Sequence, residues 1–112
     1  MLNVVSGAAF LYAAAVSLYA AGKAGLVAAT KSMAAEFAPH GIRVNALSPG
    51  TVDTDMVRAN SAEAQVEMTK LQLLPRMAHP DEMFGAALLL TSDAGSFITG
   101  SVLFADGGMV PR

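Results

Sequence analysis

The sequence predicts an α/β protein built on a parallel sheet. Three short runs of apolar and β-branched residues, 1–6, 42–49 and 101–105, alternate with longer segments that have helical spacing. Strands that alternate with helices are joined by right-handed crossovers, which makes the strands parallel. Such strands are buried on both faces, which accounts for a composition that is 54% hydrophobic and 14% charged. At 112 residues the chain forms one domain at most.

The first strand and the first helix follow from local residue patterns. The segment "MLNVVS" (1–6) is short, apolar and β-branched, as a buried strand is. Residues 7–16 are expected to form a crossover loop. Ser17 is the expected N-cap of a helix that runs to about Ala38, where a proline and a glycine follow. The residues at helical spacing on one face of this helix are Leu26, Thr30, Met33 and Phe37.

The second strand and the second helix come next. The segment "IRVNALSP" (42–49) is predicted as a strand that a Pro-Gly breaker ends, and residues 50–60 are expected to form a loop. Asn60 or Ser61 can cap the second helix, because Glu63 follows Asn60 by three residues as in a capping box. The apolar positions expected on this helix include Val66, Leu71 and Leu74.

The last helix and the last strand complete the alternation. Pro80 is the expected first residue of a third helix, "DEMFGAALLLTS", because proline is favoured at that position and two acids in the first turn suit the helix dipole. The segment "SVLFA" (101–105) is the third predicted strand, and "DGG" ends it.

Composition excludes several classes of function. The formal net charge is −2, and there is neither a basic stripe nor interleaved aromatic residues, so we expect no nucleic-acid partner. The chain has no cysteine, which excludes disulfides and fits a reducing, cytoplasmic location. Its two histidines lie far apart beside turns, so no metal site is expected. The uncharged first 22 residues leave a membrane or secreted segment as an alternative, although no Lys or Arg precedes the apolar run and polar residues interrupt it.

Tyr19 and Lys23 form the first candidate site. They lie four residues apart on the first predicted helix, so both side chains leave from one face. An ammonium near a phenol favours the phenolate and lowers its pKa, which makes a proton donor usable near neutrality. The alternative is a helix with a core tyrosine and a surface lysine. Tyr12 provides an internal comparison, since Val16 stands four residues after it.

Two further groups follow the ends of predicted strands. Ser6 ends the first strand, where a hydroxyl can hydrogen-bond a substrate carbonyl, although a serine that begins a turn before Gly7 is the better interpretation of this residue read alone. Pro49 and Gly50 follow the second strand at the same edge of the sheet, and the loop "PGTVDTD" exposes backbone amides that can hold a planar amide. The two acids of this loop are more typical of a solvated loop or a helix start than of a metal site.

Four motifs in register give the chain its resemblance to the classical short-chain dehydrogenase/reductase family. They are Ser6, "YAAGK" at 19–23, "GIRVNALSPGTVDT" at 41–54 and "ITGSVLFADGG" at 98–108. The resemblance covers essentially the whole chain. It implies a Rossmann-like fold and an oxidoreductase that transfers a hydride between NAD or NADP and a small carbonyl or alcohol substrate.

The resemblance also implies a role for each matching residue. Tyr19 would be the general acid or base, Lys23 would tune it and bind the nicotinamide ribose, and Ser6 would orient the substrate oxygen. Pro49 and Gly50 would form the turn beside the nicotinamide. Val52, through its backbone, and Thr54 would meet the carboxamide of the nicotinamide. Residues 55–75 would form the variable substrate lid, in which Met56 shapes the pocket.

The same resemblance identifies residues 1–112 as the C-terminal, catalytic half of a single Rossmann-fold domain. No Gly-rich turn for the cofactor's pyrophosphate appears in the sequence. A misassigned start, a frameshift and a genuine truncation each explain this. We therefore expect three strands with one unpaired edge, poor NAD(P)H binding and little turnover by the chain alone. The family implies homo-oligomers for the complete protein, and the alternative function is a catalytically incompetent subunit that associates with full-length relatives.

Overall fold

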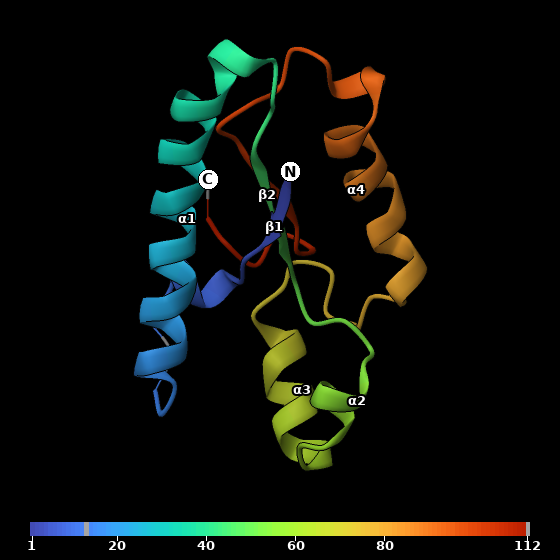
Figure 1. The fold of residues 1–112 in the computed structure, drawn as a ribbon. Helices are drawn as coiled ribbons and strands as arrows, with labels where there is room; N and C mark the ends of the chain where they lie inside the picture. Colours follow the sequence, from blue (N-terminus) through green and yellow to red (C-terminus); the bar gives the residue numbers. More distant parts are fainter. Residues whose placement is uncertain (13, 112) are drawn as a thin grey trace.

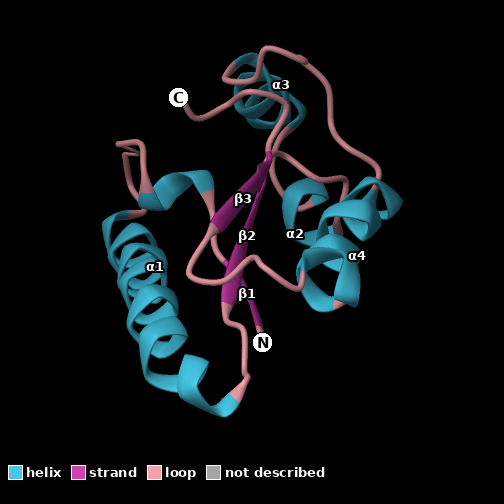
Figure 2. Ribbon diagram, turned by 90° about the horizontal axis from the view of Figure 1, so that it is seen from above, coloured by secondary structure: helices cyan, strands magenta, loops and turns pink. Residues whose placement is uncertain are grey.

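A three-stranded parallel sheet with helices on both faces forms the centre of the computed structural model, which describes residues 1–12 and 14–111. One long helix covers one face of the sheet and a shorter helix covers the other (Figures 1 and 2). The strands are β1 (Leu2–Val4), β2 (Asn45–Pro49) and β3 (Val102–Ala105). The α-helices are α1 (Ser17–Phe37), α2 (Asp55–Arg58), α3 (Ala62–Lys70) and α4 (Phe84–Thr91). The 3-10 helices are η1 (Gly7–Ala9), η2 (Ala38–His40), η3 (Pro80–Met83) and η4 (Asp93–Gly95).

The sheet has the order β1-β2-β3, and both pairings are parallel, as predicted. Central strand β2 is buried along its length except at Pro49. Among the described residues, edge strand β1 pairs with β2 alone, and its last residue, Val4, is 51% exposed. The unpaired, exposed edge expected for the first strand is therefore present at β1, whereas the expectation that every strand is buried on both faces is wrong for the two edge strands, β1 and β3, which are only partly buried.

Helix α1 packs on the sheet through the face that the sequence predicts. Thr30 is fully buried, and its hydroxyl accepts a hydrogen bond of 2.9 Å from the amide of Asn3, which ties α1 to β1. Val16 is the N-cap and makes no side-chain cap bond, so the expectation that Ser17 caps α1 is wrong. The predicted crossover loop contains η1, and its residue 13 lies outside the described residues.

The segment after β2 departs most from the prediction. A four-residue helix, α2, interrupts the expected loop 50–60. Ser61 is the residue that caps α3, since its hydroxyl accepts a hydrogen bond of 3.2 Å from the backbone amide three residues later. Helix α3 ends at Lys70, so Leu71 and Leu74 follow the helix and are 62% and 59% exposed. Their expected place on its apolar face is wrong.

The predicted third helix is divided into two. Pro80 is its first residue, as expected, but the first turn is the 3-10 helix η3, and α4 begins at Phe84. His79 is the N-cap of η3, and Glu82 completes a capping box by accepting from the His79 backbone amide. Within residues 1–12 and 14–111, no helix is long and apolar enough to cross a bilayer.

Candidate functional site

The carboxyl ends of β1 and β2 lie side by side, because Val4 pairs with Leu47 and both strands run in the same direction. Ser6 follows β1 within two residues, and Pro49 with Gly50 ends β2. The first turns of α1 and the helices α2 and α3 lie toward this same end of the molecule (Figure 1). Most of the predicted site residues are therefore carried by segments that reach one edge of the sheet.

Lys23 reaches from the second turn of α1 to the end of β1. Its ammonium donates a hydrogen bond of 2.9 Å to the carbonyl oxygen of Val4. The neighbouring residue, Val5, donates to Leu47, so the alternation of backbone groups directs the Val4 carbonyl toward the free edge of β1. An ammonium has three donors, and this bond uses one of them.

Tyr19 lies one turn before Lys23 and faces the same ammonium. The Lys23 nitrogen is 5.7 Å from the centroid of the Tyr19 ring, within the range of a cation–π interaction. Tyr19 is 47% exposed, so solvent and small molecules can reach its side chain. The structure thus brings the predicted pair together on one face of α1.

Ser6 starts the 3-10 helix that follows β1. Its hydroxyl oxygen accepts a hydrogen bond of 3.2 Å from the amide of Ala8, which caps η1. This bond uses the oxygen as an acceptor and leaves the hydroxyl proton able to donate. Helix α1 packs against η1, so Ser6 belongs to the same junction as the first turns of α1. Both sequence interpretations of Ser6, as a turn former and as a donor, are compatible with this geometry.

The turn after β2 depends on a glycine. A side-chain carbon at Gly50 would lie 2.7 Å from the carbonyl oxygen of the Gln72 side chain and 2.8 Å from the Cα of Asp106. The Gly50 amide donates a hydrogen bond of 3.0 Å to the Ala105 carbonyl, which fastens the turn to β3. Only glycine therefore fits between the two segments without moving the backbone.

Val52 lies in a short parallel pairing between residues 51–53 and Ala78. The Ala78 amide donates to the Thr51 carbonyl, and the Asp53 amide donates to the Ala78 carbonyl, both at 2.9 Å. Alternation turns the peptide groups of Val52 to the opposite side, where neither makes a hydrogen bond within the described residues. A free donor and a free acceptor on one extended residue suit a carboxamide ligand.

Thr54 is the N-cap of α2 and Met56 lies within it; the sequence patterns predicted a loop here instead of a helix. The Thr54 hydroxyl caps α2 by accepting from the Val57 amide at 3.4 Å, and the Met56 side chain is 78% exposed. A usable signal was present in the sequence: a Thr N-cap, an Asp in the first turn and an Arg three residues after that Asp.

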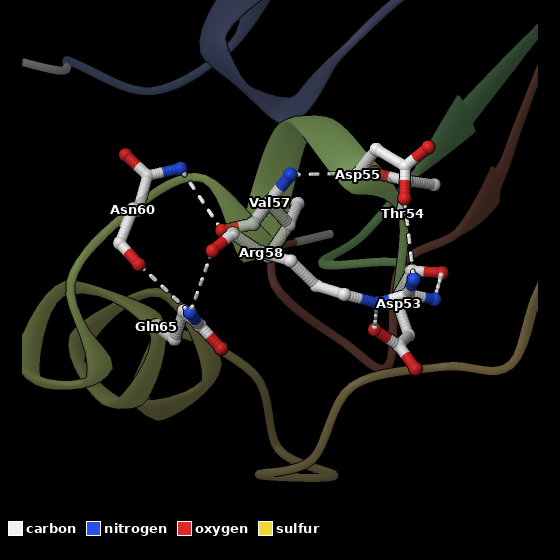
Figure 3. A network of polar contacts seen from close by, with 7 residues as sticks. All are labelled: Asp53, Thr54, Asp55, Val57, Arg58, Asn60 and Gln65. Atoms are coloured by element: carbon white, nitrogen blue, oxygen red, sulfur yellow. Dashed lines mark hydrogen bonds and ion pairs between the residues drawn. The ribbon is translucent and has the colours of Figure 1, made fainter.

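A polar network braces this segment (Figure 3). The Arg58 guanidinium lies 2.7 Å from the Asp53 carboxylate and 3.2 Å from Asp55, and the hydrogen bond from Arg58 lowers the pKa of Asp53. The Gln65 amide donates to the carbonyls of Asn60 and Arg58, which joins α3 to the end of α2. The two acids are thus paired within the loop. Among the described residues, no group of three or more His, Cys, Asp or Glu could hold a metal ion.

A cavity of about 180 Å³ lies beside the turn of Gly50 and is bordered by Gln72, Arg76 and Glu82. Its polar side chains bond one another or the backbone: the Arg76 guanidinium contacts Glu82 at 2.7 Å, and Gln72 bonds three backbone groups. Tyr19 is not among the residues that line it, and neither are Lys23 and Ser6. We therefore do not assign this cavity to the reacting groups.

Comparison with known proteins gives consistent results. The sequence model described as enoyl-(acyl carrier protein) reductase matches residues 1–110. The chain is 44% identical over 92 residues to cis-4-hydroxycyclohexanecarboxylate dehydrogenase of Sinomonas cyclohexanicum, which covers 82% of this chain and 37% of that protein. It is also 44% identical over 91 residues to the 3-oxoacyl-(acyl-carrier-protein) reductase FabG of Chlamydia trachomatis serovar D, again 37% of the relative.

Solved structures show the same fold. A 3-oxoacyl-(acyl-carrier protein) reductase from Brucella melitensis superposes with a TM-score of 0.91 at 38% identity, covering 99% of this chain and 42% of that chain. A second such reductase from Brucella melitensis, with bound NAD, superposes with a TM-score of 0.87 at 37% identity, covering 99% of this chain and 40% of that chain. The Rossmann-like architecture is thus shown, and the chain spans well under half the length of each of these relatives.

Proposed function

The chain belongs to the short-chain dehydrogenase/reductase family, and from this premise we propose that it is the catalytic, C-terminal half of an NAD(P)-dependent oxidoreductase. The reaction is the interconversion of a small carbonyl compound and its alcohol. The observation that carries the proposal is the position of the Lys23 ammonium, which bonds the end of β1 and lies 5.7 Å from the Tyr19 ring.

Three side chains of this chain handle the substrate oxygen. In the direction of reduction, the Tyr19 phenol donates its proton to the carbonyl oxygen as that oxygen gains negative charge. The positive charge of the Lys23 ammonium, 5.7 Å from the centroid of the Tyr19 ring, would offset the negative charge left on the phenol oxygen. The Ser6 hydroxyl donates to the same oxygen and fixes its position. The placement of Ser6 at the end of β1 and of Tyr19 on the adjoining helix supports this division of roles.

The residues at the strand ends fit the nicotinamide end of NAD or NADP. When bound, the nicotinamide supplies or accepts the hydride. The two remaining donors of Lys23 would hold the ribose hydroxyls, and Pro49 with Gly50 would border the ring. The unpaired peptide groups of Val52 and the hydroxyl of Thr54 would bind the carboxamide, which the free backbone of Val52 supports.

The substrate would lie between these groups and the segment that carries α2 and α3. Met56 is exposed on α2 and would contact the substrate together with Ser6 and Tyr19. Relatives are named as reductases of 3-oxoacyl groups on acyl-carrier protein and as a dehydrogenase of a hydroxycyclohexane carboxylate. The substrate class that we propose is accordingly a small-molecule ketone or secondary alcohol, used in the cytoplasm by a homo-oligomeric enzyme.

A chimera tests the proposal. The N-terminal part of the Brucella melitensis reductase with bound NAD, which this chain does not cover, is joined to residues 1–112. We expect carbonyl-dependent oxidation of NADH or NADPH by the chimera and little by the isolated chain.

In the chimera, Tyr19→Phe should lower kcat by about 10²–10⁴-fold with cofactor affinity unchanged. Tyr12→Phe is the matched control, because Tyr12 is fully exposed and should leave kcat unchanged. A Tyr19→Phe chimera with normal kcat would refute the assigned role.

A second candidate function is that of a non-catalytic subunit that associates with full-length relatives. The observation in its favour is α4, whose Phe84 and Leu88 are 60% and 63% exposed although the helix carries no charged residue. A helix that is apolar all round is normally buried. Co-expression of the tagged chain with the Brucella melitensis reductase, followed by pull-down, distinguishes the two. Mixed oligomers that Phe84→Lys abolishes favour the subunit role, and their absence removes it.

A further inference from the structure

We propose that Gln72 is a positioning residue that fixes the backbone turn of residues 50–52 at the nicotinamide end of the site. The inference rests on the proposed function for its consequence on cofactor binding. It concerns the neck, which we define as residues 51–53 together with their pairing partner Ala78. Residues 54–77, which contain α2 and α3, are joined to the rest of the fold at both ends through the neck.

Gln72 is buried, and its side chain makes three hydrogen bonds, one to the neck and two to the segment that follows Gln72 itself. It is 7% exposed. Its side-chain carbonyl oxygen accepts a hydrogen bond of 2.6 Å from the Thr51 amide. Its side-chain nitrogen donates hydrogen bonds of 3.0 Å to the Leu74 carbonyl and 2.7 Å to the Arg76 carbonyl. Only one orientation of the carboxamide satisfies all three partners, because the oxygen must face an N–H and the nitrogen must face two carbonyls.

The surrounding backbone is packed closely around this carboxamide. A side-chain carbon at Gly50 would meet the Gln72 oxygen, and one at Gly107 would lie 3.5 Å from the Gln72 nitrogen. The Leu74 backbone amide donates a hydrogen bond of 3.0 Å to the Gly107 carbonyl. Gln72 therefore stands where the segments after β2, after α3 and after β3 converge, and its amide holds two of them directly.

The bond to Thr51 acts on Val52 through one peptide unit. The Thr51 amide is held by Gln72 and the Thr51 carbonyl by Ala78, so both groups of that residue are fixed. The Val52 N–H shares a peptide plane with the Thr51 carbonyl, and the Val52 carbonyl shares one with the Asp53 amide. Ala78 therefore holds both groups, and Gln72 adds an anchor one peptide unit before them. Removing the Gln72 amide should release the residue that precedes this pairing and so loosen the Val52 backbone, while the reacting groups on α1 stay in place.

Hydrogen exchange measured by NMR on the 112-residue chain tests the anchor without any cofactor. Gln72→Met keeps the size of the side chain and removes all three bonds. We expect the Thr51 amide to exchange at least about tenfold faster, with the amides of α1 unchanged. Gln65→Met is the control, since Gln65 bonds only carbonyls at the end of α2 and after it. Unchanged protection of Thr51 in Gln72→Met would overturn the proposal.

The consequence for the cofactor is tested in the chimera by NADH fluorescence. Gln72→Met should weaken NADH binding about tenfold and raise the KM for NADH, with a smaller effect on kcat. Gln65→Met should leave the affinity and the KM for NADH unchanged. Faster exchange at Thr51 with unaltered NADH affinity would refute the role toward the cofactor. A parent chimera that binds no NADH would refute the proposed function itself, whereas the exchange result would still report on the anchor.

Discussion

The ammonium of Lys23 donates to the carbonyl oxygen of Val4 at 2.9 Å, so the second turn of α1 is fastened to the last residue of β1. This single bond relates the helix that carries Tyr19 to the strand that precedes Ser6. The Val4 carbonyl faces the free edge of the sheet, where no strand among the described residues competes for it. Lys23 therefore has a structural partner as well as the catalytic neighbour that its spacing predicts.

Replacing Lys23 with methionine separates these two roles. The bond to Val4 is solvent-exposed, so its loss should cost only about 0.5–1 kcal/mol of unfolding free energy in urea titrations. In the chimera, the same variant should lose most of kcat and bind NADH more weakly, because the phenolate and the ribose both lose their cation. Lys31→Met, at an exposed position on the same helix, should leave the unfolding free energy, kcat and NADH affinity unchanged. Retention of kcat in Lys23→Met would contradict the proposed mechanism.

The fold could be predicted because its signals are local. Alternating apolar runs predicted three parallel strands, and helical spacing predicted the buried face of α1, where Thr30 is fully buried. The motif residues could be placed at one edge of the sheet because parallel strands end together. The apolar pattern of residues 1–6 does not predict the exposure of β1, since a strand's position at the edge depends on which strands neighbour it; the unpaired edge was expected only from the resemblance to half of a larger sheet.

The residues that the sequence did not reveal act through long-range hydrogen bonds. Gln72 follows α3 within a stretch of exposed leucines, where a polar residue suggests only solvent. Its bond to the Thr51 amide joins residues 21 apart, and no local pattern predicts it. Leu71 and Leu74 lie beyond the end of α3. The chain leaves the helix after Lys70, and Gln72 bonds the neck two residues later.

Asn45 is another polar residue whose importance appears only in three dimensions. It is fully buried. Its side-chain nitrogen donates a hydrogen bond of 2.8 Å to the Ile98 carbonyl, and its side-chain oxygen accepts one of 3.0 Å from the Ser101 backbone amide. Asn45→Leu should lower the unfolding free energy by about 1–3 kcal/mol for each backbone group left unpaired. Asn60→Leu should cost less, about 0.5–1 kcal/mol, because the side-chain amide of Asn60 donates to the Met56 and Val57 carbonyls from an exposed position. Urea denaturation compares them, and equal losses would argue against the assigned role of Asn45.

Gly50→Ala should destabilise the fold because the new methyl group meets Gln72 and the Asp106 backbone at 2.7–2.8 Å. Overpacking of this kind costs about 1–3 kcal/mol. Gly22→Ala is the matched control. It lies within α1 with no atom within 4 Å of the added carbon, so it should raise stability by about 0.4–1 kcal/mol. Thermal unfolding of the two variants should therefore shift in opposite directions, and a neutral Gly50→Ala would refute the close packing of this turn.

Glu82 should give the fold a measurable dependence on acid. Hydrogen bonds from the Arg76 guanidinium, then from the His79 backbone, lower the pKa of Glu82 from its ordinary 4.5 to about 2. A carboxyl whose pKa falls on folding stabilises the protein above its unfolded value, so this contribution is full above pH 4.5 and is lost as pH falls toward 2.

The test is to follow urea unfolding between pH 7 and pH 2 in the parent chain and in Glu82→Gln. The variant cannot ionise at this position, so its stability should fall less steeply between pH 4.5 and 2 than that of the parent. Glu67→Gln is a suitable control, because Glu67 pairs with Lys70 at 2.6 Å on the exposed face of α3, away from the capping box. Parallel curves for the parent and Glu82→Gln would show that the carboxylate at the start of η3 is not bound in the folded protein as the structure describes.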